Sequence, residues 1–217
     1  MIRQQLRRKA RTTFRSQEGW WCRGYLPHYD APGKVQFITI RLADALPQSL
    51  HGALHAELAM LQDKSIGGQA MALEKQRRIE KFLDAGYGSC SLQRPDVAKL
   101  VVDSLKFLSV HGHRVLRWVI MPNHVHLLIV VRCDTSLSAV VRSFKGWTAA
   151  RANRIIGSSG SFWYPEYFDR YIRDTAHFSK VVRYIDANPV RAGLVANQAD
   201  WRFSSVGWPA AFDELSA

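Results

Sequence analysis

Residues 121–130 read MPNHVHLLIV and combine a turn signal with an apolar run. Met-Pro-Asn is typical of a tight turn, and the run that follows is typical of a buried strand. The preceding segment, RVLRWVI at 114–120, has the same β-branched and aromatic composition. The two runs predict an antiparallel hairpin around the turn. Two of the eight histidines, His124 and His126, stand at the start of its second strand.

The segments around this hairpin predict an α+β fold. KVQFITIRL, at 34–42, has strand composition, and the helices follow from periodicity and helix-stop signals. The predicted helices cover 50–63, 68–85, 94–112 and 134–157, followed by an extended aromatic stretch at 162–173 and a last helix at 174–188. This order favours an antiparallel sheet of the ferredoxin-like split βαβ type, with helices on one face and an inserted helical segment.

Length and hydrophobic content predict one domain with flanking segments. The chain has 217 residues, of which 47% are hydrophobic, enough for one sizeable core. We expect a basic and aromatic N-terminal arm at 1–33, a single domain at 34–208 and a C-terminal tail at 209–217. The helical insertion within the domain is expected at about 50–93.

The charge of the chain favours a polyanionic partner. Thirty Lys and Arg residues against 18 Asp and Glu give a net charge of +12 and a pI near 10.0. Such a field attracts polyanions, and nucleic acid is the commonest of them. The alternative is a basic surface that serves only solubility.

Cysteine usage and hydropathy bear on the compartment. Cys22, Cys90 and Cys133 are far apart and form no C-x-x-C pair, which argues against a disulfide framework or a thiolate zinc site. No apolar run approaches the roughly 18 residues of a membrane span, and the basic N-terminus lacks the apolar segment of a secretory signal. We therefore expect a cytoplasmic protein without a membrane partner.

The spacing of His124 and His126 places both side chains on one face of their strand, because side chains alternate along a strand. The opposite face carries the apolar residues Val125, Leu127 and Ile129. Two neutral imidazoles about 6–7 Å apart along a strand can converge on one cation. The alternative is a pair of histidines that are hydrogen-bonded at the rim of a sheet.

The last predicted helix carries a polar flank beside its apolar stripe. Tyr184 and Asn188 are four residues apart and share one face of the helix. Pro189 predicts that the helix ends near Asn188. The alternative role for Tyr184 is an aromatic side chain that closes the rim of the core. The stripe itself consists of Phe178, Val181, Val182 and Ile185.

Several motifs occur in an order that resembles one protein family. They are MPNHVHLLI, SFKGWTAARANR, FWYPEYFDRYIRD, VVRYIDANPVRAGLV and WRFSSV. In this order they closely resemble the REP-associated tyrosine transposases, part of the group of HUH single-strand DNA transposases named for a His-hydrophobic-His motif. The resemblance runs from about residue 34 to residue 208.

The resemblance implies an enzyme that cuts and rejoins single-stranded DNA with a divalent cation, Mg²⁺ or Mn²⁺. His124 and His126 match the metal-binding pair, and Tyr184 matches the nucleophile that forms a 5′-phosphotyrosine. Asn188 stands where related transposases place a third metal ligand, often a glutamine. The family typically acts on hairpin-forming repeats, so the implied partner is single-stranded or hairpin DNA, and the implied location is at the nucleoid.

Three other tyrosines are rival nucleophiles, namely Tyr164, Tyr167 and Tyr171. They lack a partnering amide and lie in the extended aromatic stretch, so Tyr184 is preferred. No general base is obvious in the sequence, and His177 is a candidate only by its place at the start of the last helix.

The predicted DNA contacts come from basic residues near aromatic ones, the mixture that single-strand binders use. An alternative function is a regulatory or architectural protein that binds DNA hairpins and whose catalysis is vestigial. A replication or conjugation initiator with the same chemistry is a third reading. The sequence leaves open whether the protein is a monomer or a homodimer. The predicted DNA-binding residues are Arg142, Lys145, Arg151 and Arg154 of the helix at 134–157, with Arg170 and Arg173 in the aromatic stretch.

Overall fold

A computed structural model describes residues 14–15, 20–22, 27–29, 33–47 and 68–206. The helix predicted at 50–63 and the tail at 209–217 lie outside these residues, as does most of the predicted arm at 1–33. The predicted domain boundaries therefore stay predictions. Within the described part of the chain, no helix is both long and apolar enough to cross a membrane.

The main sheet has four antiparallel strands in the order β5-β6-β4-β7. The predicted hairpin is confirmed, because β5 and β6 pair directly and the amide of Met121 donates to the carbonyl of His124 across the turn. The central strand β6 pairs with β5 on one side and β4 on the other. The strands are β4 at Val35–Arg41, β5 at Arg114–Ile120, β6 at His124–Val130 and β7 at Phe168–Tyr171.

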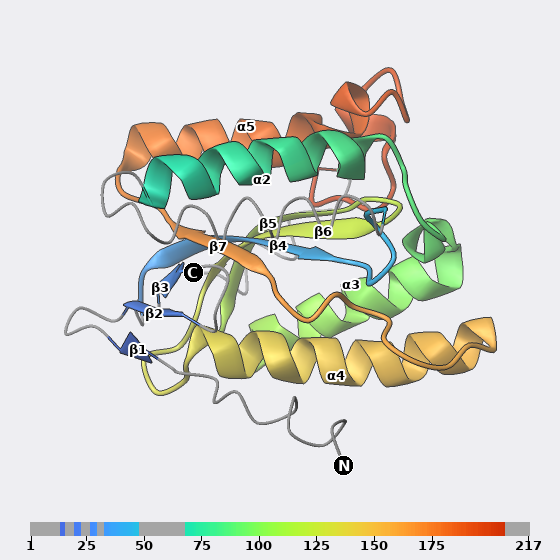
Figure 1. The fold of residues 1–217 in the computed structure, drawn as a ribbon, viewed down its shortest axis with the longest axis horizontal. Helices are drawn as coiled ribbons and strands as arrows, with labels where there is room; N and C mark the ends of the chain where they lie inside the picture. The colour runs from blue at the N-terminus through green and yellow to red at the C-terminus, as the bar shows by residue number, and fades with distance from the viewer. Residues whose placement is uncertain (1–13, 16–19, 23–26, 30–32, 48–67, 207–217) are drawn as a thin grey trace, which may run out of the picture.

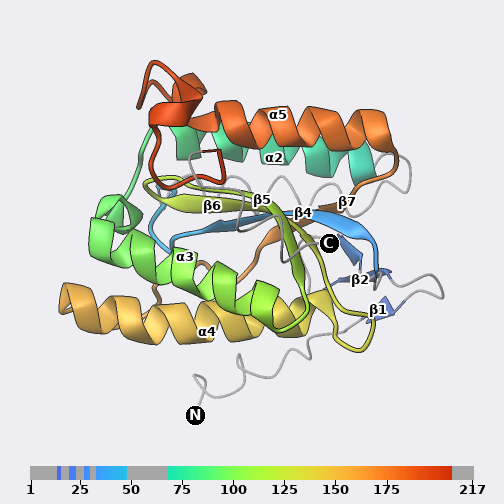
Figure 2. The same cartoon turned by 180° about the vertical axis from the view of Figure 1, so that it is seen from behind.

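Helices cover both faces of this sheet (Figure 1). The helices α3 (Pro95–Val110) and α4 (Leu137–Ile156) are the two crossover helices of the split βαβ unit, and they lie together on one face. The helices α2 (Gly68–Asp84) and α5 (Thr175–Arg191) lie side by side on the other face, as the reverse view in Figure 2 also shows. The predicted α+β fold with an antiparallel sheet is thus confirmed, but the prediction of helices on one face was wrong, because α2 and α5 add a second helical layer.

The reason for two layers is that the sheet is apolar on both faces. On β6, Val125, Leu127 and Ile129 belong to the core formed with α3 and α4, whereas Leu128 belongs to a second cluster with Ile185 of α5. Each face needs its own cover to remove this surface from water. The histidine pair lies on the face covered by α2 and α5, because it alternates with the residues of the first core.

Most helix boundaries follow the expected signals. Ser136 caps α4 by accepting a hydrogen bond from the amide of Ala139, and Gly157 ends it in the left-handed conformation. One boundary prediction was wrong: α5 continues through Pro189 to Arg191. Proline removes the hydrogen bond that its own amide would donate and crowds the carbonyl four residues earlier. The next turn still forms, because the amide of Ala192 donates to the carbonyl of Asn188 at 3.0 Å.

Two peripheral elements cover the edges of the sheet. Three short antiparallel strands, β1 (Phe14–Arg15), β2 (Trp20–Cys22) and β3 (Pro27–Tyr29), form a second sheet whose β3 lies beside β7. The WRFSSV motif covers the free edge of β5, where Ser204 bridges Val119 and the indole of Trp201 donates to the carbonyl of Ile120 at 3.0 Å. This motif therefore has a structural role.

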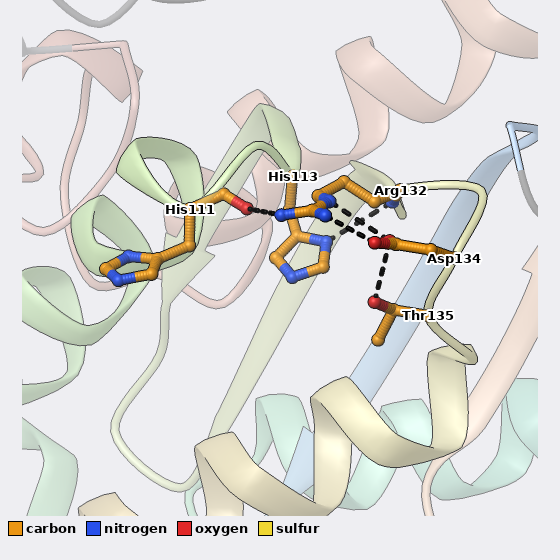
Figure 3. A network of polar contacts seen from close by, with 5 residues as sticks. All are labelled: His111, His113, Arg132, Asp134 and Thr135. Atoms are coloured by element: carbon orange, nitrogen blue, oxygen red, sulfur yellow. Dashed lines mark hydrogen bonds and ion pairs between the residues drawn. The ribbon is translucent and has the colours of Figure 1, made fainter.

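A network of hydrogen bonds and an ion pair lies at the end of β6 that is distant from the histidine pair (Figure 3). Arg132 pairs with Asp134 and also donates to the carbonyl of His111 at 3.2 Å, while its amide donates to Nδ1 of His113 at 3.3 Å. Asp134 further accepts from the hydroxyl of Thr135 at 3.1 Å. The network joins the loop before β5 to the connection between β6 and α4, so it holds both hairpin strands in register.

Candidate active site on the face covered by helices α2 and α5

The two histidines lie together on one face of the sheet, as their spacing predicts. In the register of β6 with β4, His124 stands opposite Arg41 and His126 opposite Thr39. Both imidazoles are 0% exposed. Their Nε2 atoms are 3.1 Å apart, so the two rings converge at one point above the sheet.

Hydrogen bonds at the other ring nitrogen set the orientation of each imidazole. Nδ1 of His124 lies 2.8 Å from the side-chain oxygen of Asn123, whose own amide donates to the carbonyl of Tyr87. Because that oxygen can only accept, Nδ1 of His124 carries the proton and its Nε2 keeps a lone pair. Nδ1 of His126 lies 2.9 Å from the hydroxyl of Thr39, which can accept in the same way. Both Nε2 lone pairs are then available to one ligand.

Burial keeps both histidines neutral. It lowers the pKa of His124 to about 3, because the charged ring would lose its hydration. Burial likewise lowers the pKa of His126 well below its usual value, and the neighbouring His124 and the cation of Arg191 lower it further. Neutral imidazole is the form that binds metal ions, so neither site needs to lose a proton first.

Tyr184 brings a phenol to this pair from α5. Its hydroxyl oxygen lies 3.4 Å from Nε2 of His126, and the two ring centroids are 5.2 Å apart in an edge arrangement. Phe37 of β4 packs against both rings, stacked on His126 and edge-on to Tyr184. The phenol and the histidine pair therefore meet within one chain.

Helix α2 places acidic residues beside this phenol. The carboxylate of Glu80 interacts electrostatically with the phenol of Tyr184, and the side-chain amide of Gln76 donates to Glu80 at 3.2 Å. Burial raises the pKa of Tyr184 well above its usual value, and the charges of Glu80 and Asp84 raise it further, whereas Arg191 opposes them. Burial also raises the pKa of Glu80. Sequence reasoning missed Glu80, because no local pattern links α2 to a residue about one hundred positions later.

Asn188 lies one turn after Tyr184 on α5 and is 0% exposed. Both its side-chain oxygen and its side-chain nitrogen are buried without a hydrogen-bond partner. A buried amide without hydrogen-bond partners is destabilising, so its presence indicates a functional role such as ligand binding. Because α5 continues through Pro189, Asn188 keeps its helical position relative to Tyr184.

This donor set fits a divalent cation. Adjacent ligand atoms of an octahedral ion bound at about 2.1 Å lie about 3 Å apart, which matches the 3.1 Å between the two Nε2 atoms. The described residues contain no group of three His, Cys, Asp or Glu side chains that could hold a metal ion. The side-chain oxygen of Asn188, which has no hydrogen-bond partner, is a candidate for a third protein ligand.

The rival tyrosines have other surroundings. Tyr167 is buried in the core formed with α3 and α4, on the face opposite the histidines. Tyr171 stands opposite Gln36, which alternates with Phe37 and so faces that same layer. The ring of Tyr164 lies under the guanidinium of Arg41. Among the described tyrosines, Tyr184 has a hydrogen bond to the histidine pair.

The predicted general base His177 lies two helical turns before Tyr184. Its amide is bound by the capping residue Asp174, and its Nδ1 accepts from the amide of Arg173 at 3.3 Å. Burial lowers its pKa, and the cations of Arg170 and Arg173 lower it further. His177 belongs to a basic cluster at the start of α5.

The predicted DNA-binding residues divide between two layers. Arg170 stands opposite Phe37 and so shares the face of the histidine pair, and Arg173 is exposed nearby. The ammonium of Lys145 donates to the carbonyls of Tyr164 and Pro165 at 2.6 and 2.8 Å, which gives it a contact within the protein. The remaining three are exposed on α4, across the sheet from the histidines, and they are Arg142, Arg151 and Arg154.

Comparisons with known proteins agree with the resemblance predicted from the motifs. Residues 102–188 match the family model described as "Transposase IS200 like". The REP-associated tyrosine transposase of Escherichia coli (strain K12) is 32% identical over 90 residues, which are 41% of this chain and 51% of that protein. This chain thus matches about half the length of that curated relative. Residues 102–188, matched by the family model, contain both histidines, Tyr184 and Asn188.

A solved structure supports the fold. It is described as the REP-associated tyrosine transposase bound to a REP hairpin, and it matches with a TM-score of 0.50 at 19% identity. The match covers 83% of this chain and 81% of that one. The α+β fold of this chain is therefore similar to the fold of that solved structure.

Proposed function

We propose that the protein is a metal-dependent single-strand DNA endonuclease and strand transferase that works through a 5′-phosphotyrosine. One observation carries the proposal: the hydroxyl of Tyr184 lies 3.4 Å from Nε2 of His126, which lies 3.1 Å from Nε2 of His124. The match to IS200-like transposases over the segment that holds these residues supports it. The REP hairpin bound by the related transposase favours hairpin-forming repeat DNA as the substrate of this chain as well.

The proposed roles follow from the geometry. His124, His126 and the amide oxygen of Asn188 would hold Mg²⁺ or Mn²⁺. When bound there, the cation supplies positive charge that orients a phosphodiester and neutralises the charge that develops on it. Asn123 and Thr39 keep the two imidazoles in the tautomer that presents Nε2.

Tyr184 is the proposed nucleophile. Its oxygen forms a bond to phosphorus while the bond from phosphorus to the 3′ oxygen breaks, which leaves a 5′-phosphotyrosine and a free 3′ hydroxyl. One phosphoester replaces another, so the 3′ hydroxyl of a strand can reverse the step without ATP. Glu80 lies beside this phenol and is the proposed acceptor of its proton.

The site is closed in this structure, since both histidines are 0% exposed. A DNA phosphate reaches them only when the layer above this face of the sheet shifts. Helix α2 lies beside α5 in that layer and carries Glu80 and Asp84 at the phenol. Two carboxylates there disfavour a phosphate until they are protonated, displaced or neutralised.

The closed site also favours a second candidate function. A protein that only binds DNA hairpins, as a regulator or an architectural factor, needs no access to the histidines. Both functions use a basic surface, but only the enzyme needs the histidine pair, Tyr184 and a metal ion together.

A covalent-adduct assay distinguishes the two functions. The protein is incubated with Mn²⁺ and a hairpin oligonucleotide that has single-stranded flanks, and adducts are resolved under denaturing conditions. We expect an adduct from the wild-type protein and from Tyr171→Phe, but none from Tyr184→Phe. An adduct that survives Tyr184→Phe would move the nucleophile elsewhere, and the absence of any adduct with intact hairpin binding would favour the second function.

His126→Ala tests the metal-binding role separately. We expect it to stop cleavage and to leave hairpin affinity within a few-fold of wild type. The proposed place of action, the nucleoid within the cytoplasm, follows from the proposed DNA substrate and stays a prediction.

A further inference from the structure

Arg41 is a largely buried cation that stands directly beside the histidine pair. It is the last residue of β4 and faces His124 across the sheet, so their Cβ atoms are about 5 Å apart and point to the same side. Thr39, two residues earlier, shows the same geometry, because its hydroxyl reaches Nδ1 of His126. The side chain of Arg41 therefore projects onto the face that holds the candidate active site.

The guanidinium of Arg41 lacks a carboxylate counter-ion among the described residues. Its Nη1 is buried without a hydrogen-bond partner, and no carboxylate in the described part of the chain forms an ion pair with it. Burial lowers the pKa of Arg41 to about 10, which still leaves the group charged at neutral pH. Burying a guanidinium whose Nη1 makes no hydrogen bond is destabilising, and a bound counter-charge would offset this cost.

The side chain is held in place for a ligand. The guanidinium carbon lies 3.5 Å from the ring centroid of Tyr164 and so stacks on that ring. The amide of Tyr164 donates to the carbonyl of Arg41 at 2.9 Å, and the carbonyl of Tyr164 accepts from the ammonium of Lys145 at 2.6 Å. The backbone of Tyr164, which carries the supporting ring, is thus held by two hydrogen bonds. The next residue, Leu42, is bound through its amide to the carbonyl of Asn123, which orients His124.

We propose that Arg41 binds a backbone phosphate of single-stranded DNA next to the phosphate that is cleaved. Its Nη1, which is buried and has no hydrogen-bond partner in the free protein, donates to a non-bridging oxygen when DNA binds, while the opposite side of the guanidinium plane stays on Tyr164. Arg41 is partly accessible to solvent, unlike the histidines, so the DNA strand can reach it first. This inference rests on the proposed function, and it makes Arg41 a substrate-binding residue.

Binding is tested without catalysis, in the Tyr184→Phe protein with EDTA, using a labelled hairpin oligonucleotide that has single-stranded flanks. We expect Arg41→Met to weaken binding about tenfold and to reduce the slope of log affinity against log salt by about 0.7, the value for one phosphate contact on a single strand. Arg114→Met removes an exposed cation at the far end of β5 and should change affinity less than twofold. Equal affinities for Arg41→Met and its parent would overturn the inference.

A scan of the flanks with single methylphosphonates identifies the contact, because each substitution removes one phosphate charge. We expect one position at which the substitution weakens the parent protein but has no effect on Arg41→Met. If Arg41→Met is as sensitive as its parent at every position, Arg41 contacts no phosphate and the inference fails. If Arg41→Met does not fold, Arg41→Lys, which keeps the charge but loses the stacked fork, should show a partial loss at that same position, and full sensitivity there overturns the inference.

The outcomes separate this inference from the proposed function. In one outcome, the wild-type protein forms no adduct while one phosphate position still depends on Arg41. This outcome contradicts the proposed chemistry and supports the phosphate site. If Arg41→Met forms the adduct normally and binds DNA with unchanged affinity, the phosphate site is refuted and the proposed chemistry is supported.

Discussion

Acidification should destabilise the metal-free protein through His124, because the folded state holds this imidazole neutral. Its pKa is about 3 in the folded protein and about 6.5 in an unfolded chain. Below the unfolded pKa the unfolded chain binds a proton that the folded protein does not, so stability falls as pH falls from about 6.5 towards about 3. Between about pH 7.5 and about pH 5 the loss is about 2 kcal/mol, or about 4–8 °C in Tm for a domain of this size. His126 adds to the loss in the same direction.

The assay is urea unfolding followed by circular dichroism at the two pH values, with EDTA present. His124→Asn is the matched variant, since its side-chain nitrogen can replace Nδ1 as the donor to Asn123 and no longer titrates. We expect the difference in unfolding free energy between the two pH values to shrink by about 2 kcal/mol in this variant. The control is His111→Asn, which removes an exposed histidine. It measures how the loss of a histidine outside the site changes the pH dependence of the unfolding free energy. Equal pH dependence in His124→Asn and wild type would refute a buried neutral imidazole.

Three further predictions concern the core, a turn and DNA binding. Trp163→Phe should destabilise the protein by about 2 kcal/mol, because the indole donates to the buried hydroxyl of Thr148 at 2.8 Å; thermal unfolding measures the effect. Gly112→Ala should cost about 1–3 kcal/mol in the same assay, since Gly112 has φ of 83° and an added Cβ would lie 2.8 Å from Cδ of Arg132. The logarithm of hairpin affinity, measured by fluorescence anisotropy, should fall linearly with the logarithm of salt concentration, with a slope of about 0.7 per phosphate contact on single strands.

Each of these predictions has a control or an excluding result. Trp147→Phe changes an exposed indole on α4 and should leave Tm nearly unchanged. Gly160→Ala also places a side chain at a positive φ, of 97°, but nothing lies within 4 Å of the added Cβ, so an excess cost at Gly112 indicates the contact with Arg132. Equal Tm values for Trp163→Phe and Trp147→Phe would contradict the role of the indole hydrogen bond. Equal costs at the two glycines would contradict the contact with Arg132. A salt-independent affinity would contradict binding through phosphates.

Local patterns were sufficient for the features that depend on periodicity. The alternation of β6 placed both histidines on one face, and the four-residue spacing placed Tyr184 and Asn188 on one side of α5. The cap at Ser136 and the stop at Gly157 followed from side-chain chemistry alone. The end of α5 was mispredicted, because the preference of proline for a helix start is weaker than the packing that holds Pro189 in a buried position.

Features that depend on contacts distant in sequence could not be predicted. Nothing near Glu80 indicates that α2 lies against α5, since that contact is decided by the whole second layer. Arg41 left a weak signal, because an arginine two residues after Thr39 occupies an inward position of a strand. Recognising its meaning required the register with β6, which pairs residues more than eighty positions apart.

Tyr184 and Asn188 occupy consecutive turns of one continuous helix, so they can move only as a unit. If α5 tilts away from the sheet, the attacking oxygen and the amide oxygen leave the histidine pair in the same motion. Under the proposed chemistry, a displaced helix removes the nucleophile and weakens the hold on the cation at once. Such coupling would give the protein a resting form unable to nick DNA by accident, without any separate inhibitory segment.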